Sequence, residues 1–500
     1  MSAPGRRSSV FLTLATLLVL AAIRFDALPL LRGPAPYPPE WQWEYRPAAE
    51  GGSWLPCLAT GGGLLALLAL SASPWARRRP TRTAAAILGT GLLLGWGHQL
   101  ALLTLEPDGA LHTLLERTLS RTITSYHTAA LSAEARDPIE FLRRHADLLP
   151  GFRTSAKHAA THPPGPVLFY RGLIALCEAS PGLTRRTLAA LGESPDRPLR
   201  PPQTPATRAA ALLGALLLGL VGASTAVPVS ALARRVTGDA LAAARVGVVW
   251  GLVPGPALMT PQFDQALALP VAASAALLAS ALTRDRPGGR ALLAGVCGAL
   301  AFSTSYGAAA FLAIGSAAAL SITLGHGAPV SRLPMVVGLA SAGPAAGLAF
   351  SMLVGHEPLR SALTALALHR EVYTRPRSYA LWLAFNPLDL AVFLGVPVAV
   401  LLAIRAGRSW SLTIRHDPGP GAGDRLRVVV TAGLALLLLS GVTRGEVGRL
   451  WIPIMPFLLV AALEEPRSAE GGPTIGWAHA LLVGALLLPL DLAIRVHWRL

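Results

Sequence analysis

The chain has few of the charged and thiol groups that soluble proteins of its length contain. Charged residues make up 14% of its 500 residues, against about 25% in a typical soluble chain. Lys157 is the single lysine, so the net charge of +16 comes almost entirely from arginine. The three cysteines, Cys57, Cys177 and Cys297, lie inside apolar blocks. This indicates small buried side chains and argues against disulfides or a cysteine-rich zinc site.

What the chain has instead is long apolar runs. Hydrophobic residues make up 52% of the sequence, the mean hydropathy is +0.50, and runs such as 64–70, 210–221 and 434–439 have no polar face. A helix that is apolar on every side lies in lipid or in a large core. The arginines stand in short clusters between these runs, as at 77–79 and 234–235. That pattern sets membrane topology and does not indicate a nucleic-acid-binding surface.

The apolar runs predict an all-α, polytopic transmembrane protein with about 12–14 membrane segments in a single integral membrane domain over residues 1–500. The first segment resembles a signal peptide, but no clear cleavage site follows it, so we expect a retained helix. The predicted segments are 9–25, 54–72, 84–104, 163–179, 209–232, 243–260, 265–283, 291–304, 306–325, 333–355, 388–405, 428–442, 450–463 and 475–494.

Three predicted loops are long enough to carry function, at residues 26–53, 105–162 and 356–387. If basic clusters stay inside, all three loops face outward, provided that the short segment 163–179 dips into the membrane and returns. We expect the segment 163–179 to return to the outer side, because a full crossing there would put the basic cluster at 234–235 outside. It also brings the polar motifs to one face.

The most specific motif is Thr161-His162-Pro163-Pro164-Gly165-Pro166, where the outer loop 105–162 meets an apolar segment. Prolines fix the backbone where a helix starts, so they hold the histidine at the membrane surface. One interpretation is a helix start with an interfacial histidine, and the other is a binding site.

This motif and its surroundings resemble the C-type glycosyltransferase (GT-C) superfamily, which includes protein O-mannosyltransferases and aminoarabinose transferases. Members carry a Lys/His-Pro-Pro motif at this point, matched by His162-Pro163-Pro164. An upstream tyrosine and alanine are matched in part by the run from Tyr126 and His127 to Ala130. The similarity covers roughly residues 105–325. Downstream of the His-Pro-Pro motif, the similarity rests on Arg234-Arg235, Gly238, Pro254 or Pro256, and Asp264.

The resemblance implies a GT-C-like arrangement with helical outer loops and an inverting transfer of a sugar from a polyprenyl-phosphate donor. The acceptor, a glycan, lipid or protein, would lie on the outer face of a bacterial inner (plasma) membrane. Some relatives use a divalent cation, so a metal is a possibility that the sequence leaves open. A transporter or flippase of lipid-linked glycans is the alternative. It would place its polar residues near the bilayer midplane, whereas an enzyme would gather them at the lipid boundary.

The expected outer-loop acid is missing here, since residues 122–125 are Thr-Ile-Thr-Ser. Asp264 is the preferred catalytic carboxylate, because an acid beside a membrane segment is costly and rarely accidental; a helix N-cap is the other interpretation. Asp26 is the reserve base, with Asp137 and Glu140 as further substitutes. The resemblance assigns His162 to donor-phosphate or acceptor binding.

Arginines near the membrane surface are candidates for the donor phosphate, since guanidinium groups bind phosphate oxygens in pairs. Arg444, Glu446 and Arg449 lie together between two apolar runs and are expected to bind the donor. An exposed ion pair in a turn is the alternative interpretation. We also assign substrate contacts to Arg171, Tyr126 and His127.

Overall fold

The computed structural model describes residues 3–25, 27, 43–45, 52–121, 123–191, 203–283, 287–327, 329–415, 421–464 and 476–496. Of these described residues about 82% are helical, which confirms the all-α class. The strands β1 (Trp43–Tyr45) and β2 (Ile494–Val496) pair antiparallel, with Glu44 opposite Arg495. The helices of the bundle are α1 (Ala3–Arg24), α2 (Leu55–Leu70), α4 (Pro80–Leu103), α10 (Pro205–Ser224), α11 (Ala226–Thr237), α12 (Ala240–Trp250), α14 (Phe263–Thr283), α15 (Gly288–Thr304), α16 (Ala308–Gly325), α17 (Leu333–Leu353), α19 (Tyr379–Leu394), α20 (Val396–Ile414), α21 (Ala422–Ser440), α23 (Met455–Leu463) and α24 (Trp477–Ala493).

The other helical elements connect these helices. They are α3 (Pro74–Arg78), α5 (Ala110–Leu119), α6 (Tyr126–Ala130), α7 (Pro138–Ser155), η2 (Ala159–Thr161), α8 (Gly165–Ala179), α9 (Pro181–Ala189), α13 (Pro254–Leu258), η3 (Val330–Arg332), α18 (Pro358–His369), η4 (Arg370–Thr374), α22 (Val447–Leu450) and η5 (Ile452–Ile454).

Several helices have the length and composition of membrane spans. In the described part of the chain five helices are both long enough and apolar enough to cross a membrane. The bent pair α19–α20 adds a sixth if it is counted as one span. The five are Pro80–Leu103, Pro205–Thr237, Phe263–Thr283, Ala308–Gly325 and Val330–Leu353. Other apolar helices have only 10–17 residues, less than the roughly 20 of a perpendicular span. The protein is therefore polytopic, with fewer full-length spans than the 12–14 segments predicted.

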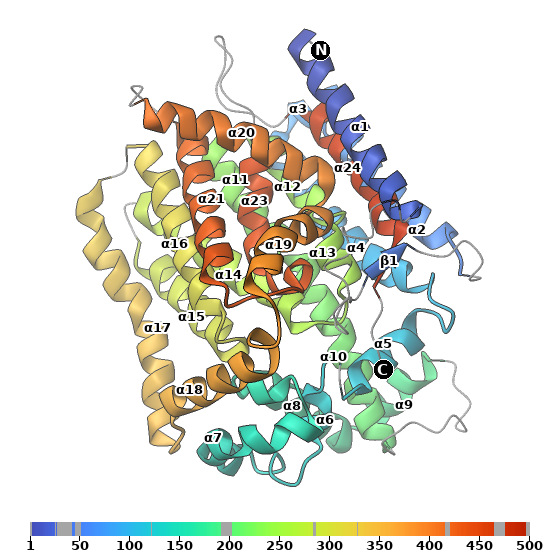
Figure 1. Cartoon of the computed structure of the whole chain (residues 1–500), viewed down its shortest axis with the longest axis vertical. Helices are drawn as coiled ribbons and strands as arrows, with labels where there is room; N and C mark the ends of the chain where they lie inside the picture. Colours follow the sequence, from blue (N-terminus) through green and yellow to red (C-terminus); the bar gives the residue numbers. More distant parts are fainter. Residues whose placement is uncertain are drawn as a thin grey trace.

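One predicted segment differs from the helices observed. The sequence predicts one span at 388–405, but the chain bends there by 116° between α19 and α20. The bend falls at Gly395, whose φ of +93° a side chain would disfavour. The segment predicted at 163–179 corresponds to α8, a helix of 15 residues that packs against α6 (Figure 1).

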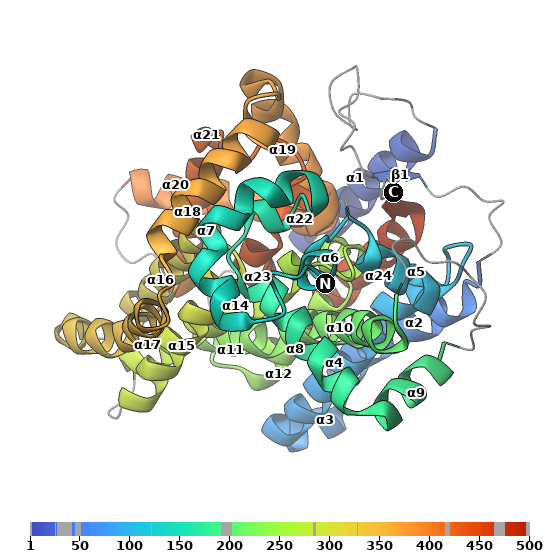
Figure 2. The same cartoon turned by 90° about the horizontal axis from the view of Figure 1, so that it is seen from below.

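The helices α5 to α9 and α18 gather at one end of the bundle, opposite the N-terminus (Figure 1), and Figure 2 shows them spread across that end. We call them the loop layer. Within it, hydrogen bonds between side chains and the main chain join α7 to the loop that precedes α18. His356 donates from Nδ1 to the oxygen of Leu142 at 2.8 Å, and Arg143 donates from Nε to the oxygen of Val354 at 3.1 Å. These bonds fix the loop that follows α17 against α7.

Helix α17 is held to the bundle mainly by one close helix–helix contact. Only 6% of the apolar stretch of this helix is buried inside the protein, so most of the helix faces outward. Along its contact with α15, a Cβ on Gly295 would collide with the main-chain oxygen of Ala340, and one on Gly343 would collide with Gly295. Small residues at such a crossing let two helix backbones approach closely in a membrane.

Replacing Gly295 with alanine should therefore destabilise the protein. A methyl group there forces α15 and α17 apart, at a cost of about 1–3 kcal/mol. In Gly298→Ala the new Cβ would lie 3.9 Å from Leu312, an ordinary contact. That control should be neutral or slightly stabilising, because alanine favours helix over glycine. Thermal unfolding midpoints in one detergent would distinguish the variants, and equal shifts for the two would contradict the close contact.

Acidic pH should loosen the loop layer through His145. Burial, followed by the neighbouring His356, lowers the pKa of His145 to about 3. The unfolded chain, with an ordinary histidine pKa of about 6.5, binds more protons than the folded protein below that pH. Stability is therefore full above about pH 6.5 and is lost as the pH falls, by about 1.4 kcal/mol for each pH unit.

The check is the unfolding midpoint from pH 7.5 to pH 5 for the wild type and His145→Phe. The variant keeps an aromatic ring in the site and should show a shallower pH dependence. His326→Gln, an exposed histidine elsewhere, should keep the wild-type slope. A His145→Phe slope as steep as the wild type would contradict the role of His145.

Candidate functional site

A small polar cavity lies where the loop layer meets the bundle. Three segments far apart in the sequence line it, at residues 158–162, 369–377 and 442–450. Its volume is about 30 Å³, which is room for about two water molecules.

The charged centre of the site is the carboxylate of Glu446 between two arginines. Arg377 donates from Nη2 to Oε1 at 2.7 Å, and Arg449 donates from Nη2 to Oε2 at 2.8 Å. All three side chains are nearly buried, with 7–11% exposed. Burial opposes ionisation, but Arg449 and then Arg377 outweigh it and hold the pKa of Glu446 below the ordinary value of a glutamate.

A tight turn after α21 presents Glu446, and Arg449 follows it in α22. Gly441, Gly445 and Glu446 all have positive φ, and Glu446 is at +59°. Such a conformation in a non-glycine residue is uncommon and is typical of functional sites. Side chains of α19 hold the turn: Asn386 accepts from the N–H of Gly445, and Asp389 accepts from the N–H of Gly448, both at 3.0 Å.

Asp264 adds the second carboxylate. It is the second residue of α14, where the helix dipole favours a negative charge. Its Oδ2 lies 3.6 Å from Nε of Arg449, and its side chain is 14% exposed. Arg449 thus lies between two acids, Asp264 and Glu446. Glu446 and Asp264 outweigh the effect of burial and raise the pKa of Arg449.

The His-Pro-Pro segment brings an imidazole to the same place. Nδ1 of His162 donates to the oxygen of His158 at 2.8 Å, and burial lowers the pKa of His162 to about 4. His162 is therefore neutral at pH 7, with Nε2 left as an acceptor. Its ring meets the ring of Tyr126 edge-on at 5.4 Å. Ser125 accepts the N–H groups of His158 and Ala159, at 3.0 and 3.3 Å, which ties α6 to this segment.

Two further side chains lie at the cavity or beside a residue that lines it. Nε2 of His158 faces Nη1 of Arg449 at 3.4 Å, and its buried Nδ1 has no hydrogen-bond partner. Burial and then Arg449 hold the pKa of His158 well below its ordinary value. Lys157 lies over the ring of Tyr373, 5.0 Å from its centre. Tyr373 belongs to the π-helical turn η4, a distortion that is frequent at functional sites.

The structure brings most of the predicted site residues together. His162, Glu446 and Arg449 line the cavity. Asp264 and Tyr126 adjoin it through Arg449 and His162. Asp26 lies outside the described residues.

Three predicted binding residues have structural contacts instead. His127 is fully buried away from the cavity, with Nε2 bonded to the oxygen of Thr207 at 2.9 Å. Arg171 pairs with Glu178 at 3.6 Å. Arg444 lines the cavity, but its guanidinium donates to the main-chain oxygens of Thr374 and Arg377. These three side chains therefore support the surrounding fold.

The substitute bases also have other roles. Asp137 accepts the N–H groups of Ile139 and Glu140 at 2.8 and 3.1 Å, as the N-cap of α7. Glu140 is half exposed beside Arg143. Neither carboxylate lines the cavity.

Sequence analysis missed Arg377, His369, Tyr373 and Lys157. All four come from segments without membrane-span periodicity or a recognisable motif. The only signal for them was the polar composition of loops 105–162 and 356–387, which indicates function but cannot identify single residues.

The residues at the cavity do not fit a divalent cation. Across the described ranges, no group of three His, Cys, Asp or Glu has the geometry to hold a metal ion. Both acids at the cavity, Asp264 and Glu446, already lie against Arg449. A guanidinium in that position repels a second cation, so we derive no step through a metal.

Replacing Glu446 with glutamine should destabilise the protein strongly. The neutral amide removes the charge that joins the nearly buried Arg377 and Arg449, a loss of about 3 kcal/mol. In the control Glu357→Gln, the affected pair with Arg360 is more than half exposed and should cost less than about 1 kcal/mol. Unfolding midpoints measured side by side would test this. Similar small shifts for both would show that the pairs at Glu446 contribute little.

No family model, curated protein or solved structure matches the chain. The functional argument therefore rests on the geometry of the cavity and on the motifs that lead to it.

Proposed function

We propose that this protein is a membrane glycosyltransferase of the GT-C type. It moves a sugar from a polyprenyl-phosphate donor to an acceptor on the outer face of a bacterial inner membrane. The observation that carries the proposal is the convergence of Tyr126, His162, Asp264, Glu446 and Arg449. These residues come from four separate segments and surround or adjoin one cavity at an end of the spans.

Asp264 is the proposed general base. It is a carboxylate at the cavity that keeps one weak ion-pair contact, at 3.6 Å, whereas Glu446 is held by two arginines at 2.7 and 2.8 Å. Asp264 accepts the proton of the acceptor hydroxyl as its oxygen bonds to the anomeric carbon. The bond from that carbon to the phosphate oxygen breaks, and the electron pair leaves with polyprenyl phosphate.

Arg449 and Lys157 are the proposed partners of the donor phosphate. A guanidinium presents two parallel donors to phosphate oxygens, and an ammonium adds a compact charge. Glu446 is a positioning residue, because its two ion pairs fix the planes of Arg377 and Arg449. The neutral His162 offers Nε2 as an acceptor for a sugar hydroxyl.

Substrate entry requires the segment 369–377 to move. The cavity of about 30 Å³ holds water but not a hexose. This segment contributes His369, Tyr373 and Arg377 to the lining and connects α18 to α19, so its displacement opens the cavity toward the loop layer. Closure over a bound sugar would exclude water from the reaction.

The position of Asp264 favours an enzyme over a transporter of lipid-linked glycans. As the second residue of a 21-residue helix, it lies at the end of a span. A transport site is expected near the bilayer midplane, between broken helices. The His162 segment lies at the same end, in contact with the loop layer.

The test is sugar transfer from a polyprenyl-phosphate sugar donor by purified protein in lipid nanodiscs, comparing wild type with Asp264→Asn. Loss of a general base should lower the rate of transfer by about 100-fold or more. The amide keeps the shape of the side chain but removes one charge from the buried cluster, so the unfolding midpoint should fall, though less than in Glu446→Gln because the contact of Asp264 with Arg449 is longer. Transfer rates are therefore compared at a temperature at which both proteins are folded.

The matched control is Asp147→Asn, an exposed acid of α7 paired with Arg360, which should retain full activity. Equal rates for wild type and Asp264→Asn would remove Asp264 from the role of base. Wild-type protein that moves the intact donor across a vesicle membrane without transferring sugar would favour the transporter.

A further inference from the structure

One side of helix α18 carries a row of exposed leucines. Leu359, Leu363 and Leu366 are 73%, 59% and 50% exposed. Their spacings of four and three residues place all three on the same side of the helix, and we call them the leucine row. Ser361 and Ala365, on the opposite side, are fully buried, and α18 packs against α7 and η2.

This arrangement is the reverse of that in a helix at a water-exposed surface. Such a helix turns its apolar side toward the core and its polar side toward water. In α18 the side toward the protein has the small side chains of Ser361 and Ala365, while three leucines face away from the protein. Adjacent exposed apolar side chains mark a surface that contacts another protein or a membrane.

The leucine row continues the outward apolar surface of α17, a helix with the length and composition of a membrane span. Met352 and Leu353 are exposed at the end of α17. Only four residues separate Leu353 from Pro358, the first residue of α18. The chain turns sharply between them, since the N–H of His356 donates to the oxygen of Ser351 at 2.8 Å. Helix α18 therefore begins within about 17 Å of the end of a span.

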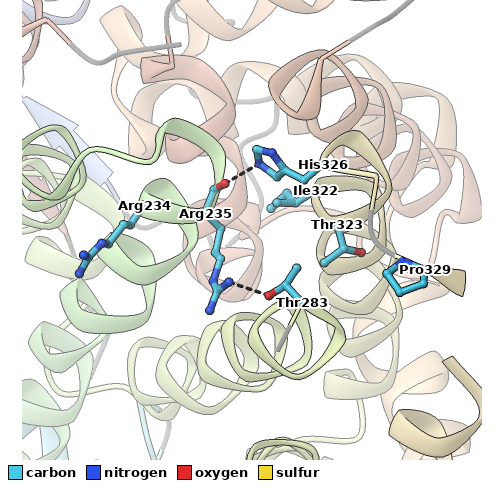
Figure 3. A pocket seen from close by; sticks show the side chains of 7 residues that line it. All are labelled: Arg234, Arg235, Thr283, Ile322, Thr323, His326 and Pro329. Atoms are coloured by element: carbon cyan, nitrogen blue, oxygen red, sulfur yellow. Dashed lines mark hydrogen bonds between the residues drawn. The ribbon is translucent and has the colours of Figure 1, made fainter. Parts of the chain in front are cut away.

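Basic residues at the far end of the bundle indicate which side of the membrane α18 faces. Arg234 and Arg235 lie near the end of α11, and Arg235 donates to Oγ1 of Thr283, the last residue of α14, at 2.6 Å (Figure 3). Basic clusters at the ends of spans stay on the inner side of a membrane. Asp264 is at the other end of α14, which this rule places outside together with the loop layer. Figure 2 shows α18 running from α17 toward α19 across that end.

We propose that α18 lies in the surface of the outer leaflet, with the leucine row among the lipid chains. Amphipathic helices of this kind bury their apolar side about 5–10 Å into the boundary between head groups and acyl chains. Lipid is the occupant that the structure favours, because the row is continuous with the outward face of a span that lipid already surrounds. A second copy of the chain is the other possible occupant.

This contact also bears on the segment that lines the cavity. Helix α18 continues directly into η4, and the segment 369–377 contributes His369, Tyr373 and Arg377 to the lining. An α18 that is bound to lipid holds this segment at the membrane boundary. The proposed contact does not depend on the glycosyltransferase activity, since it follows from the exposed leucines and from α17.

The experiment uses a nitroxide spin label on Leu363→Cys in lipid nanodiscs. The background is Cys297→Ala, because the other two native cysteines, Cys57 and Cys177, are buried. Collision of the label with oxygen, which concentrates in lipid, is compared with collision with a water-soluble nickel complex. The label should collide mainly with oxygen, at a depth of about 5–10 Å. The matched control is Thr154→Cys, an exposed position of α7, whose label should collide mainly with nickel.

Two outcomes would overturn the proposal. A label at position 363 that collides with nickel as often as the control shows that water covers the leucine row. A label that is shielded from both reagents shows that protein, such as a second copy of the chain, covers it. If Leu363→Cys does not fold, Leu366→Cys tests the same row. Sugar transfer is not measured, so a protein without that activity would give the same result.

Discussion

The buried ion pairs of Glu446 are the interaction on which the candidate site depends. This one carboxylate joins Arg377, which follows α18, to Arg449 in α22, and Arg449 in turn reaches Asp264 at the start of α14. Two guanidinium groups and two carboxylates therefore balance each other in a nearly buried cluster. Burying unbalanced charges at this depth would cost several kcal/mol. Because the four charges balance, the segment after α18, the turn after α21 and the start of α14 can pack together around this cluster.

The sequence predicted those parts of the structure that local rules determine. The His-Pro-Pro motif and Asp264 were found because proline and a lone acid beside an apolar run have strong local preferences. Arg377 was not found, since its partner Glu446 is 69 residues away and nothing local distinguishes it from other loop arginines. Gly395 was missed as a bend because the apolar run continues across it. His127 was included with Tyr126, although neighbours on a helix point about 100° apart and only one can face the cavity.

Arginines pair with acids and bind main-chain oxygens at both ends of the molecule. At the candidate site Arg449 pairs with Glu446, and Arg444 donates to main-chain oxygens of the segment 369–377. At the other end Arg427 pairs with Asp424 and Glu464 and also donates to the main-chain oxygen of Ala461, near the end of α23. Cations in that position satisfy the last carbonyls of a helix.

The charge balance of the site also constrains the proposed reaction. A polyprenyl-phosphate sugar is a phosphodiester with one negative charge, which Lys157 can offset beside the balanced cluster. When the glycosidic bond breaks, the leaving phosphate gains a second negative charge, while Asp264 becomes neutral as it accepts the proton of the acceptor. The total charge is conserved, but one negative charge moves from Asp264 to the phosphate. Arg449 contacts Asp264 before transfer. When the carboxyl of Asp264 is protonated it attracts the guanidinium of Arg449 less, so Arg449 can bind the leaving phosphate as the negative charge on that phosphate develops.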